Sequence, residues 1–386
     1  MDFASIVNTI RNRFGKEGFI PLHAPYFGGK EKEYLIECID STFVSSVGPF
    51  VDRFEKDMCK ITGAKYAIAA VNGTAALHMA MIIAGVKQDD EVLSQALTFV
   101  ATANAIFYIG AKPVFIDVDK DTLGLSPVAA LRFLENETHQ NDKNECINTK
   151  TGRRIKACVP MHTFGFPMRV NELLEICNRY NIVLVEDAAE SLGSTIGDKH
   201  TGTIGHIAAF SFNGNKTVTS GGGGAIVTNN EEWAKRAKYL TTTAKVPHAW
   251  DFFHDEVGYN YRMPNINAAL ACAQLEQLPE ILQNKRETAE FYQTELSKLG
   301  VHVVNEQAGT KANYWLNTIV LQSREERDAF LKFSNDLGVM TRPIWTLMNR
   351  LPAFENYQTD GLENSIWLED RVVNLPSSVI YQAQDV

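Results

Sequence analysis

Residues 210–224 have the sequence FSFNGNKTVTSGGGG, in which a single lysine, Lys216, stands between two runs of different character. The apolar residues before it are typical of a strand that ends in a short polar turn. Four glycines follow, and they lead into a second apolar run at residues 225–228. A lysine placed in a turn between two strands is held at a defined position, so Lys216 is the first candidate for a catalytic side chain.

Outward from this segment, short apolar runs alternate with helix-like segments between about residues 64 and 228. This alternation predicts an α/β domain built on an open sheet. The predicted strands cover residues 67–70, 113–117, 156–161 and 182–185. The predicted helices cover residues 75–84 and 170–180 and a segment that opens at Ser126 and Pro127. The polar residues 136–154 are expected to form a surface excursion.

The pattern changes near residue 260. Two long helices are predicted there, over residues 265–282 and 284–299, with a brief interruption at Pro279. A strand, a helix and a second strand follow, at residues 315–321, 324–337 and 339–343. We therefore predict two domains, a large α/β domain at residues 1–262 and a smaller α+β domain at residues 263–386.

The composition excludes several classes of protein. The 386 residues carry a formal net charge of −9 and no long Lys/Arg run, which argues against a nucleic-acid or membrane partner. No stretch approaches the roughly 20 apolar residues of a membrane span, and the N-terminus does not resemble a secretory signal, so we expect a cytoplasmic protein. The six cysteines form no CxxC pair and the nine histidines form no HExxH motif, which argues against a structural metal.

A lysine that acts by forming a Schiff base needs a carbonyl partner. Pyridoxal phosphate would supply one if the site also held its ring nitrogen and its phosphate. An acid suited to the ring nitrogen follows the apolar run at residues 182–185, and the carboxyl ends of parallel strands are where α/β folds bind ligands. Asp187 could pair with the protonated ring there, or it could cap the next helix. Strand alternation turns the neighbouring Glu186 to the opposite face.

A phosphate site is predicted where residues 71–77 turn from a strand into a helix. Free backbone N–H groups at a helix N-terminus suit a dianion, and the Thr74 hydroxyl would add a donor beside Gly73. Thr74 could equally be only the N-cap of the helix. Ser211, five residues before Lys216, could add a second hydroxyl or be an ordinary polar residue of its strand.

Two other interpretations of the lysine segment fail on detail. A phosphate-binding P-loop places glycine directly before the lysine, whereas Asn215 stands there. A dinucleotide fingerprint requires a helix after the glycines, whereas the run after residues 221–224 is strand-like. The four glycines are expected to let the backbone pass close to a cofactor or to a partner subunit.

Five motifs along the chain resemble those of the DegT/StrS group of sugar-nucleotide aminotransferases, which are pyridoxal-phosphate enzymes of the aspartate aminotransferase fold type. They are residues 72–77 (NGTAAL), 98–105 (TFVATANA), 186–191 (EDAAES), the Lys216 segment with its glycines, and 258–263 (GYNYRM). The resemblance covers nearly the whole chain. It implies fold type I, with a mainly parallel seven-stranded sheet between helices in the large domain and a smaller C-terminal α+β domain.

The resemblance implies a pyridoxal-phosphate site with Lys216 and Asp187 as catalytic residues. Lys216 would form the Schiff base and later move protons, and the cofactor would pass through its pyridoxamine phosphate form. Asp187 would hold the ring nitrogen. Gly73, Thr74 and Ser211 would bind the phosphate.

Further contacts to the cofactor are implied by the resemblance alone. Phe99 would stack on the ring, His162 would lie in a loop near the cofactor, and Asn260 would reach the phosphate from the partner subunit of a homodimer. Without the family, Phe99 would be an ordinary aromatic of an apolar helix and His162 a structural histidine. The full set of implied cofactor-binding residues is Gly73, Thr74, Ala75, Phe99, His162, Asp187, Glu190, Ser211, Lys216 and Asn260.

One position departs from the commoner family pattern. Three residues after the ring aspartate many members carry histidine or glutamine, whereas this chain has Glu190. A carboxylate beside the phenolic oxygen of the cofactor would repel it unless the acid were protonated or turned away. We expect Glu190 to be a catalytic residue that contacts this oxygen as a neutral acid. An unchanged pKa of the Schiff base in Glu190→Gln would contradict this expectation.

Two regions are expected to bind substrate. Residues 43–51 resemble a family segment near the sugar site, which makes Ser46 a candidate; without the resemblance they would be a loop before a helix. Arg262, beside Asn260, and Arg342 in the small domain could each bind the carboxylate of an amino donor, or each could be a solvated surface residue. Of the two we favour Arg262.

These features predict a homodimeric aminotransferase that uses pyridoxal phosphate to move an amino group from L-glutamate to the keto carbon of a nucleotide-linked deoxysugar. The resemblance favours a UDP-linked 4-keto-6-deoxy-N-acetylhexosamine, as in pathways to bacillosamine or legionaminic acid. One alternative is a dTDP-linked sugar 3-aminotransferase. Another, from a different class, is a sensory or regulatory binder without turnover. A dehydratase of this fold is disfavoured because such members replace the lysine.

Overall fold

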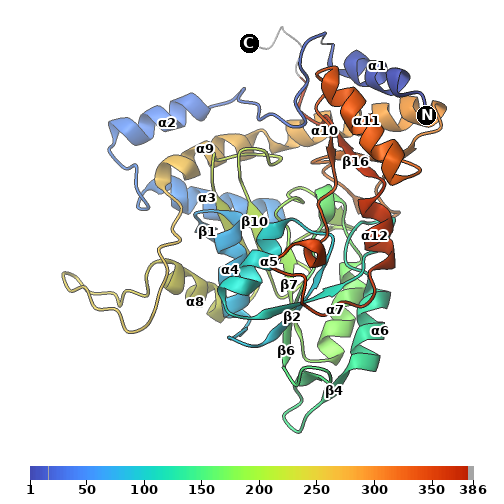
Figure 1. Cartoon of the computed structure of the whole chain (residues 1–386). Coiled ribbons are helices and arrows are strands. Elements are labelled where there is room, and N and C mark those ends of the chain that lie inside the picture. The colour runs from blue at the N-terminus through green and yellow to red at the C-terminus, as the bar shows by residue number, and fades with distance from the viewer. Residues whose placement is uncertain (16, 381–386) are drawn as a thin grey trace.

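The computed structural model describes residues 1–15 and 17–380. A seven-stranded sheet lies at its centre, with the strand order β1-β11-β10-β7-β6-β2-β3 (Figure 1). The strands are β1 (Tyr66–Ala70), β2 (Glu91–Gln95), β3 (Lys112–Ile116), β6 (Ile155–Val159), β7 (Val183–Asp187), β10 (Ile207–Ser211) and β11 (Gly224–Thr228). All neighbouring pairs are parallel except the two that β11 makes with β1 and β10. The predicted mainly parallel seven-stranded sheet is thereby confirmed.

Helices cover both faces of this sheet. One face packs against α3 (Pro49–Thr62), α6 (Pro127–Glu137), α7 (Val170–Arg179) and α9 (Asn265–Glu276). The other packs against α4 (Gly73–Ile83), α5 (Val100–Tyr108) and α8 (Glu231–Thr241). Strand alternation makes the division, as in β10, where Phe210 faces the first group and Ala209 the second.

A second, antiparallel sheet has four strands in the order β12-β14-β16-β15. They are β12 (His302–Val303), β14 (Asn317–Val320), β15 (Arg342–Pro343) and β16 (Val372–Leu375). The helices packed around them are α1 (Phe3–Phe14), α10 (Leu278–Lys298) and α11 (Arg324–Asp336) (Figure 1). Ile10, Tyr292, Ile319 and Phe330 join these elements in one buried core.

Packing between the two units crosses the predicted domain boundary. The N-terminal helix α1 lies against α10 and α11, far from the other N-terminal helices (Figure 1). Conversely, α9 packs on α3 and on the core of the central sheet. The division between residues 262 and 263 stays a prediction.

The remaining elements are short or peripheral. They are α2 (Glu31–Asp40), α12 (Glu363–Glu369), β4 (Thr138–Gln140), β5 (Cys146–Asn148), β8 (Thr195–Ile196), β9 (Lys199–His200), β13 (Thr310–Lys311) and the 3-10 turns Thr163–Gly165 and Met348–Arg350. The polar residues 136–154 contain the β4–β5 hairpin. Across the part of the chain that the structure describes, we find no helix whose length and apolar character would let it cross a bilayer.

The break between the two long helices lies earlier than the sequence predicts. Helix α9 ends at Glu276 and α10 begins at Leu278, so Pro279 stands in the first turn of α10 rather than between two helices. Proline is tolerated there because a first-turn residue needs no N–H for an intrahelical hydrogen bond. The prediction of a helix up to residue 282 was therefore wrong.

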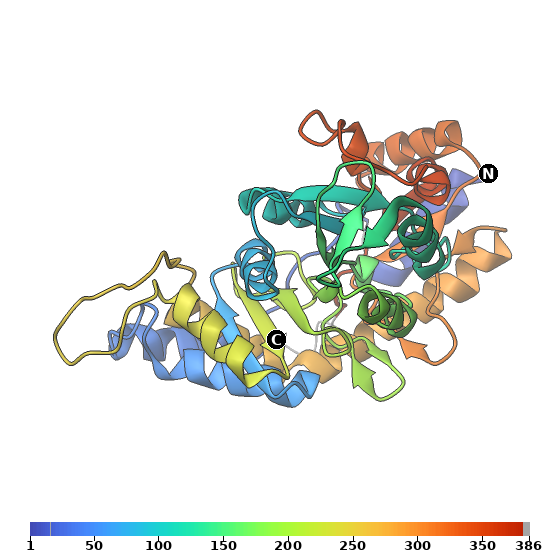
Figure 2. The same cartoon turned by 90° about the horizontal axis from the view of Figure 1, so that it is seen from below.

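A long loop at residues 245–258 projects from the body of the protein. It follows α8 and extends on the same side as α2 in both views (Figures 1 and 2). The tip carries large apolar side chains that face solvent, among them Trp250 and Phe252, which are 82% and 77% exposed. Ile36 and Ile39 of α2 and Val47 after it are also exposed. Apolar patches of this kind mark interaction surfaces.

The glycine run brings β11 against the start of α4. A Cβ at Gly224 would overlap the carbonyl of Asn72 and lie 2.9 Å from the backbone nitrogen of Gly73. A Cβ at Gly222 would meet nothing within 4 Å. The close backbone approach at Gly224 is therefore to the N-terminus of α4 in the same chain, whereas the sequence analysis expected an approach to a cofactor or a partner subunit.

This difference predicts opposite outcomes for two alanine variants of one run. Gly224→Ala should force the two backbones apart and lower the free energy of unfolding by about 1–3 kcal/mol. Gly222→Ala is the matched control, and it should leave stability nearly unchanged. Thermal unfolding of both variants measures the difference, and equal melting temperatures would contradict the packing argument.

Candidate active site

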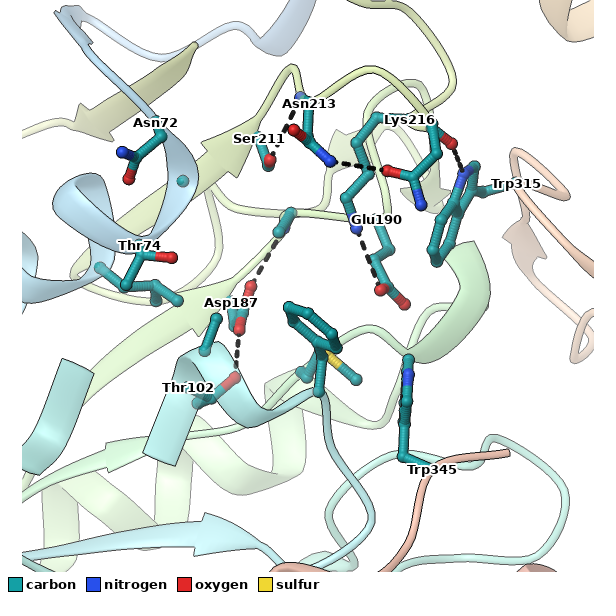
Figure 3. A pocket seen from close by; sticks show the side chains of 17 residues that line it. Asn72, Thr74, Thr102, Asp187, Glu190, Ser211, Asn213, Lys216, Trp315 and Trp345 are labelled. Atoms are coloured by element: carbon teal, nitrogen blue, oxygen red, sulfur yellow. Dashed lines mark hydrogen bonds and ion pairs between the residues drawn. The ribbon is translucent and has the colours of Figure 1, made fainter. Parts of the chain in front are cut away.

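A cavity of about 330 Å³ opens where the carboxyl ends of β7 and β10 meet the N-terminal ends of α4 and α5 (Figure 3). Trp315 and Trp345, from the C-terminal part of the chain, lie across it from Asn72 and Thr74. Its lining consists of Asn72, Gly73, Thr74, Leu77, Phe99, Ala101, Thr102, Met161, Asp187, Ala189, Glu190, Ser211, Asn213, Asn215, Lys216, Trp315 and Trp345. Seven of the ten sequence-predicted cofactor residues meet here, and they include the three predicted catalytic residues, Asp187, Glu190 and Lys216.

Lys216 lies in a tight turn after β10, where its N–H donates to the Asn213 carbonyl at 3.0 Å. Its side chain is only 12% exposed. The ammonium lies 3.1 Å from Glu190 Oε1 and 4.0 Å from the ring centroid of Trp315. Figure 3 shows the amine pointing into the cavity, with the Glu190 carboxylate next to its tip and Trp315 to one side. The turn therefore presents one amine to the cavity, as the sequence predicts.

Asp187 ends β7 with its carboxylate in the cavity. Its Oδ2 accepts from the Thr102 hydroxyl at 2.7 Å, and its Oδ1 accepts from the Ala189 N–H at 3.2 Å. Burial raises the pKa of Asp187, and the Thr102 hydrogen bond opposes that rise only in part. No ion pair to this carboxylate occurs within residues 1–15 and 17–380. A buried carboxylate of this kind is suited to a cationic ligand.

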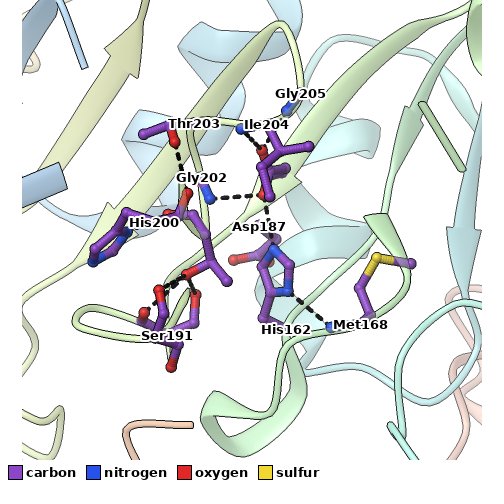
Figure 4. A network of polar contacts seen from close by, with 12 residues as sticks. His162, Met168, Asp187, Ser191, His200, Gly202, Thr203, Ile204 and Gly205 are labelled. Carbon is purple, nitrogen blue, oxygen red and sulfur yellow. Dashed lines mark hydrogen bonds and ion pairs between the residues drawn. The ribbon is translucent and has the colours of Figure 1, made fainter. Parts of the chain in front are cut away.

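Glu186 points to the opposite face of the sheet, as strand alternation predicts. Its oxygens accept from the backbone N–H groups of Gly202, Ile204 and Gly205, and Oε2 lies 2.9 Å from His162 Nε2 (Figure 4). Burial opposes ionisation, but the His162 contact and these N–H groups together hold the pKa of Glu186 below its ordinary value. The carboxylate therefore fixes the turn that precedes β10.

The structure corrects the expectation that His162 touches a cofactor. Its ring is fully buried beside Glu186, and its Nδ1 accepts from the Met168 N–H at 3.2 Å (Figure 4). The ring is absent from the cavity lining. Met161, one residue earlier, lines the cavity instead. His162 therefore contacts the carboxyl end of β7 on the face of the sheet opposite the cavity.

The start of α4 and the end of β10 form a cradle for an anion. No described residue accepts a hydrogen bond from the N–H groups of Gly73 and Thr74, which lie in the first turn of α4. A Cβ at Gly73 would lie 2.7 Å from the Ser211 Cβ, so only glycine lets the Ser211 side chain approach this closely. The Thr74 hydroxyl faces the cavity (Figure 3). Two N–H groups and two hydroxyls therefore converge at the positive end of a helix dipole.

The structure excludes the alternative interpretation of Thr74 and changes the role expected for Ala75. The N-cap is Asn72 rather than Thr74, since the Asn72 Oδ1 accepts from the Ala75 N–H at 2.8 Å. That bond already uses the Ala75 N–H, and Ala75 does not line the cavity. Ala75 is therefore not free to donate to a phosphate, while Thr74 keeps its hydroxyl for that role.

Glu190 spans the cavity wall with both oxygens occupied. Oε2 accepts from the Phe164 N–H at 2.9 Å, and Oε1 pairs with the Lys216 ammonium at 3.1 Å. Burial raises the pKa of Glu190, and the charge on Lys216 opposes that rise. The carboxyl faces the cavity beside the amine (Figure 3). Its expected contact with a phenolic oxygen stays a prediction.

Phe99 lies at the mouth of the cavity, where it is 47% exposed. It is the N-cap residue of α5 rather than part of the helix, and its ring centroid lies 6.3 Å from that of Trp345. A large aromatic ring left exposed beside a cavity is available for a planar ligand. Stacking on a cofactor ring stays a prediction.

Three predicted residues lie outside the cavity of their own chain. Asn260 is exposed and accepts from the Arg262 Nε at 3.2 Å, in the segment after the projecting loop. Ser46 is half-buried in the bend before α3. None of the three lines the cavity. Their expected contacts with cofactor or substrate stay predictions.

Sequence reasoning missed the residues that enter from elsewhere in the fold. Trp315 was predicted only as part of a strand, and no prediction was made for Trp345. Thr102 lies in a motif that the sequence singled out, but its bond to Asp187 was not foreseen. The one local signal for Thr102 was that it is a polar residue in the first turn of an apolar helix that begins within a family motif.

The sequence model of the DegT/DnrJ/EryC1/StrS aminotransferase family matches residues 25–386. The chain belongs to this family. The GDP-perosamine synthase of Escherichia coli O157:H7 is 36% identical to it over 361 residues, which cover 93% of each chain. The aminotransferase TlmJ from Streptoalloteichus hindustanus has a TM-score of 0.85 at 27% identity, covering 95% of this chain and 96% of that one. DesI, solved in the presence of its TDP-sugar product, has a TM-score of 0.80 at 26% identity, with coverages of 95% and 91%.

DegT/DnrJ/EryC1/StrS members are sugar aminotransferases of fold type I that use pyridoxal phosphate, so the predicted family, fold class, enzyme class and cofactor are confirmed. The cavity fits that cofactor in three ways. The Lys216 amine suits its aldehyde, the buried Asp187 carboxylate suits its protonated ring nitrogen, and the anion cradle at Gly73, Thr74 and Ser211 suits its phosphate.

Replacing each of the two acids at the end of β7 by its amide should change the stability of the protein in opposite directions. Because burial raises the pKa of Asp187, the folded cofactor-free protein holds this proton more tightly than the unfolded chain does. Stability therefore falls as the pH rises from the ordinary carboxyl pKa toward the raised one. We expect Asp187→Asn to raise the melting temperature of the cofactor-free protein by about 2 °C at neutral pH. It should also reduce the stabilisation that added pyridoxal phosphate gives.

Glu186→Gln serves as the matched control. Its carboxylate contributes stability above the ordinary pKa, and that stability is lost as the pH falls through the lowered value. The variant should lose about 1–3 kcal/mol at neutral pH. Thermal unfolding of both variants between pH 5 and 8, with and without the cofactor, provides the measurement. A lower melting temperature for Asp187→Asn than for the native protein would refute the argument.

Proposed function

We propose that the protein transfers the amino group of L-glutamate to the C4 keto carbon of a nucleotide-linked 4-keto-6-deoxyhexose. The observation that carries this proposal is the 36% identity to a GDP-perosamine synthase over 93% of both chains. A second relative of that name, from Vibrio cholerae, matches at 36% over 93% of this chain. The cavity, with one amine, one buried acid and one anion cradle, supports the same chemistry.

Pyridoxal phosphate, when bound, takes up the amino group and delocalises the electrons that remain when a proton leaves the neighbouring carbon. In the proposed mechanism, Lys216 Nζ would remove the α-proton of glutamate and return it to the neighbouring carbon of the bound cofactor. In the second half the same amine would act in reverse and deliver a proton to C4 of the sugar. Asp187 would hold the ring nitrogen and keep it protonated. The products are 2-oxoglutarate and the 4-amino sugar nucleotide.

The walls of the cavity assist these proton transfers. Glu190 lies 3.1 Å from the Lys216 amine, so a released lysine has a partner that holds it within the site. Leu77, Met161 and the rings of Phe99, Trp315 and Trp345 supply apolar walls. Apolar walls with few polar groups are usual for sites that orient small molecules and exclude water.

The nucleotide of the acceptor is the finer part of the proposal. The relatives named above favour a GDP-linked sugar. The resemblance of residues 43–51 and the carboxylate at Glu190 favour a UDP-linked N-acetyl sugar, which is the second candidate. Both acceptors present the same keto group at C4, so the cavity chemistry is common to them.

Purified protein loaded with pyridoxal phosphate tests the proposal in two stages. Glutamate should convert the visible absorption band into the near-ultraviolet band of the pyridoxamine form, with release of 2-oxoglutarate. The converted protein is then mixed with the GDP-linked or the UDP-linked 4-keto sugar, and recovery of the visible band is followed. We expect recovery with the GDP sugar and the 4-amino product by NMR. Faster recovery with the UDP sugar would select the second candidate, and a 3-amino product would refute both.

We also propose that the active protein is a homodimer whose two sites are shared. Asn260 and Arg262 lie outside the cavity of their own chain, in the segment that follows the projecting loop. That loop and α2 extend on the same side of the molecule (Figures 1 and 2), and both carry exposed apolar side chains. A second copy related by twofold symmetry would bury these side chains and could bring Asn260 to the anion cradle and Arg262 to the donor carboxylate.

Complementation between inactive chains tests site sharing. Lys216→Ala and Asn260→Ala chains are each expected to be nearly inactive alone. After mixing and subunit exchange, half of the dimers carry one intact site, so activity should return to about a quarter of the native value. Lys216→Ala mixed with Asp187→Asn is the matched control. Both residues lie in the cavity of one chain, so one site of each mixed dimer lacks the lysine and the other lacks the aspartate. Mixing should therefore restore no activity. No recovery in the first mixture would refute the shared site.

A further inference from the structure

The Lys216 amine has an aromatic neighbour that belongs to the C-terminal part of the chain. The ammonium lies 4.0 Å from the ring centroid of Trp315, on a side of the amine that Glu190 does not occupy (Figure 3). A cation over an indole face at this distance is attracted by the ring quadrupole. Trp345 also lines the cavity, but the described contacts of Lys216 do not include it.

Trp315 is held on several sides. Its indole Nε1 donates at 2.6 Å to the carbonyl of Asn215, the residue directly before Lys216. The ring is almost fully buried and lies 6.3 Å from that of Phe164. The same indole thus contacts both the amine of Lys216 and the backbone that carries it. A group that grips a side chain at both ends restricts where that side chain can go.

The backbone around Trp315 is tied to the other wall of the cavity. Asn313 Oδ1 accepts from the Trp315 N–H at 2.8 Å, and Asn313 Nδ2 donates to the carbonyl of Glu190 at 2.9 Å. It also lies 3.3 Å from the hydroxyl of Thr217. Between them, Tyr314 has a φ of +48°, a strained conformation for a side chain of this size. Such strain persists where the surroundings over-determine the backbone.

A second lysine is hydrogen-bonded to the turn that carries Trp315. Lys285 of α10 is 1% exposed, and its Nζ donates to the carbonyls of Trp315 at 3.2 Å and Ser377 at 2.8 Å. It also contacts the carbonyl of Tyr314 and His23 Nε2. The buried amine therefore joins α10, the segment before α2 and the end of the chain to the turn that carries Trp315.

We infer that Trp315 is a positioning residue for Lys216, which holds the amine and the Asn215 carbonyl in the geometry needed to attack the cofactor aldehyde. The ammonium first gives a proton to Glu190, whose Oε1 lies 3.1 Å away, and the neutral amine then joins the aldehyde as a Schiff base with loss of one water. A displaced amine would still be present in the cavity but would meet the aldehyde less often in a reactive orientation. This inference rests on the proposed attachment of the cofactor at Lys216.

The test follows covalent attachment rather than turnover. Cofactor-free protein is mixed with pyridoxal phosphate, and the rise of the visible band is recorded over a range of cofactor concentrations. The saturating rate reports attack by the amine, and the half-saturating concentration reports binding before attack. We expect Trp315→Leu to lower the saturating rate about tenfold, with the half-saturating concentration unchanged. Trp315→Phe keeps an aromatic face without the N–H and should show a smaller loss.

Trp367→Leu is the matched control, since this tryptophan lies on α12 against Lys120 and Arg371, outside the cavity. It should leave the saturating rate at the native value. An unchanged rate in Trp315→Leu would overturn the inference. The inference would also be overturned if both Trp315 variants showed a lower saturating rate together with a higher half-saturating concentration and a lower melting temperature. That combination indicates a merely structural role. Lys216→Ala separates the proposals, since a band that persists there refutes attachment at Lys216 itself.

Discussion

At the carboxyl end of β7, two neighbouring acids point to opposite faces of the central sheet, and the site is arranged around that division. Glu186 accepts from three backbone N–H groups of the turn before β10 and lies beside His162. Asp187 faces the cavity and accepts from Thr102 of α5. A shift of β7 by one residue would exchange the two acids. The register of this strand therefore decides both which acid holds the turn before β10 and which acid faces the cavity.

Burial sets the electrostatics of the cavity and of the turn that carries Trp315. It raises the pKa values of Asp187 and Glu190, and it lowers the pKa of Lys285 to about 7. Glu190 is paired with Lys216, and Lys285 is surrounded by carbonyls and His23. Asp187 has hydrogen-bond donors but no described ion pair. A cationic ring nitrogen would complete its surroundings, so binding of the family cofactor and relief of buried charge would occur together.

Local patterns predicted much of the fold because apolar period and turn chemistry act over a few residues. Strand β7, helix α7 and the turn into α4 lie within a few residues of their predicted positions. The sequence predictions were wrong where one local rule is compatible with two structures. Pro279 interrupts a helix or opens one, and only the packing of α10 decides between them. Similarly, both Asn72 and Thr74 are good N-caps, and the backbone geometry of Asn72 selects it.

The sequence by itself determined the family, the order of its motifs and the two side chains most suited to a cofactor, Lys216 and Asp187, since each lies in a short run of recognisable residues. Only the tertiary structure decided what surrounds them. Trp315 meets the carbonyl of Asn215 across 100 positions of the chain, and His162 turns away from the cavity because Glu186 draws its ring to the other face. Contacts between residues this far apart leave no local pattern, because they depend on how the two sheets and their helices pack.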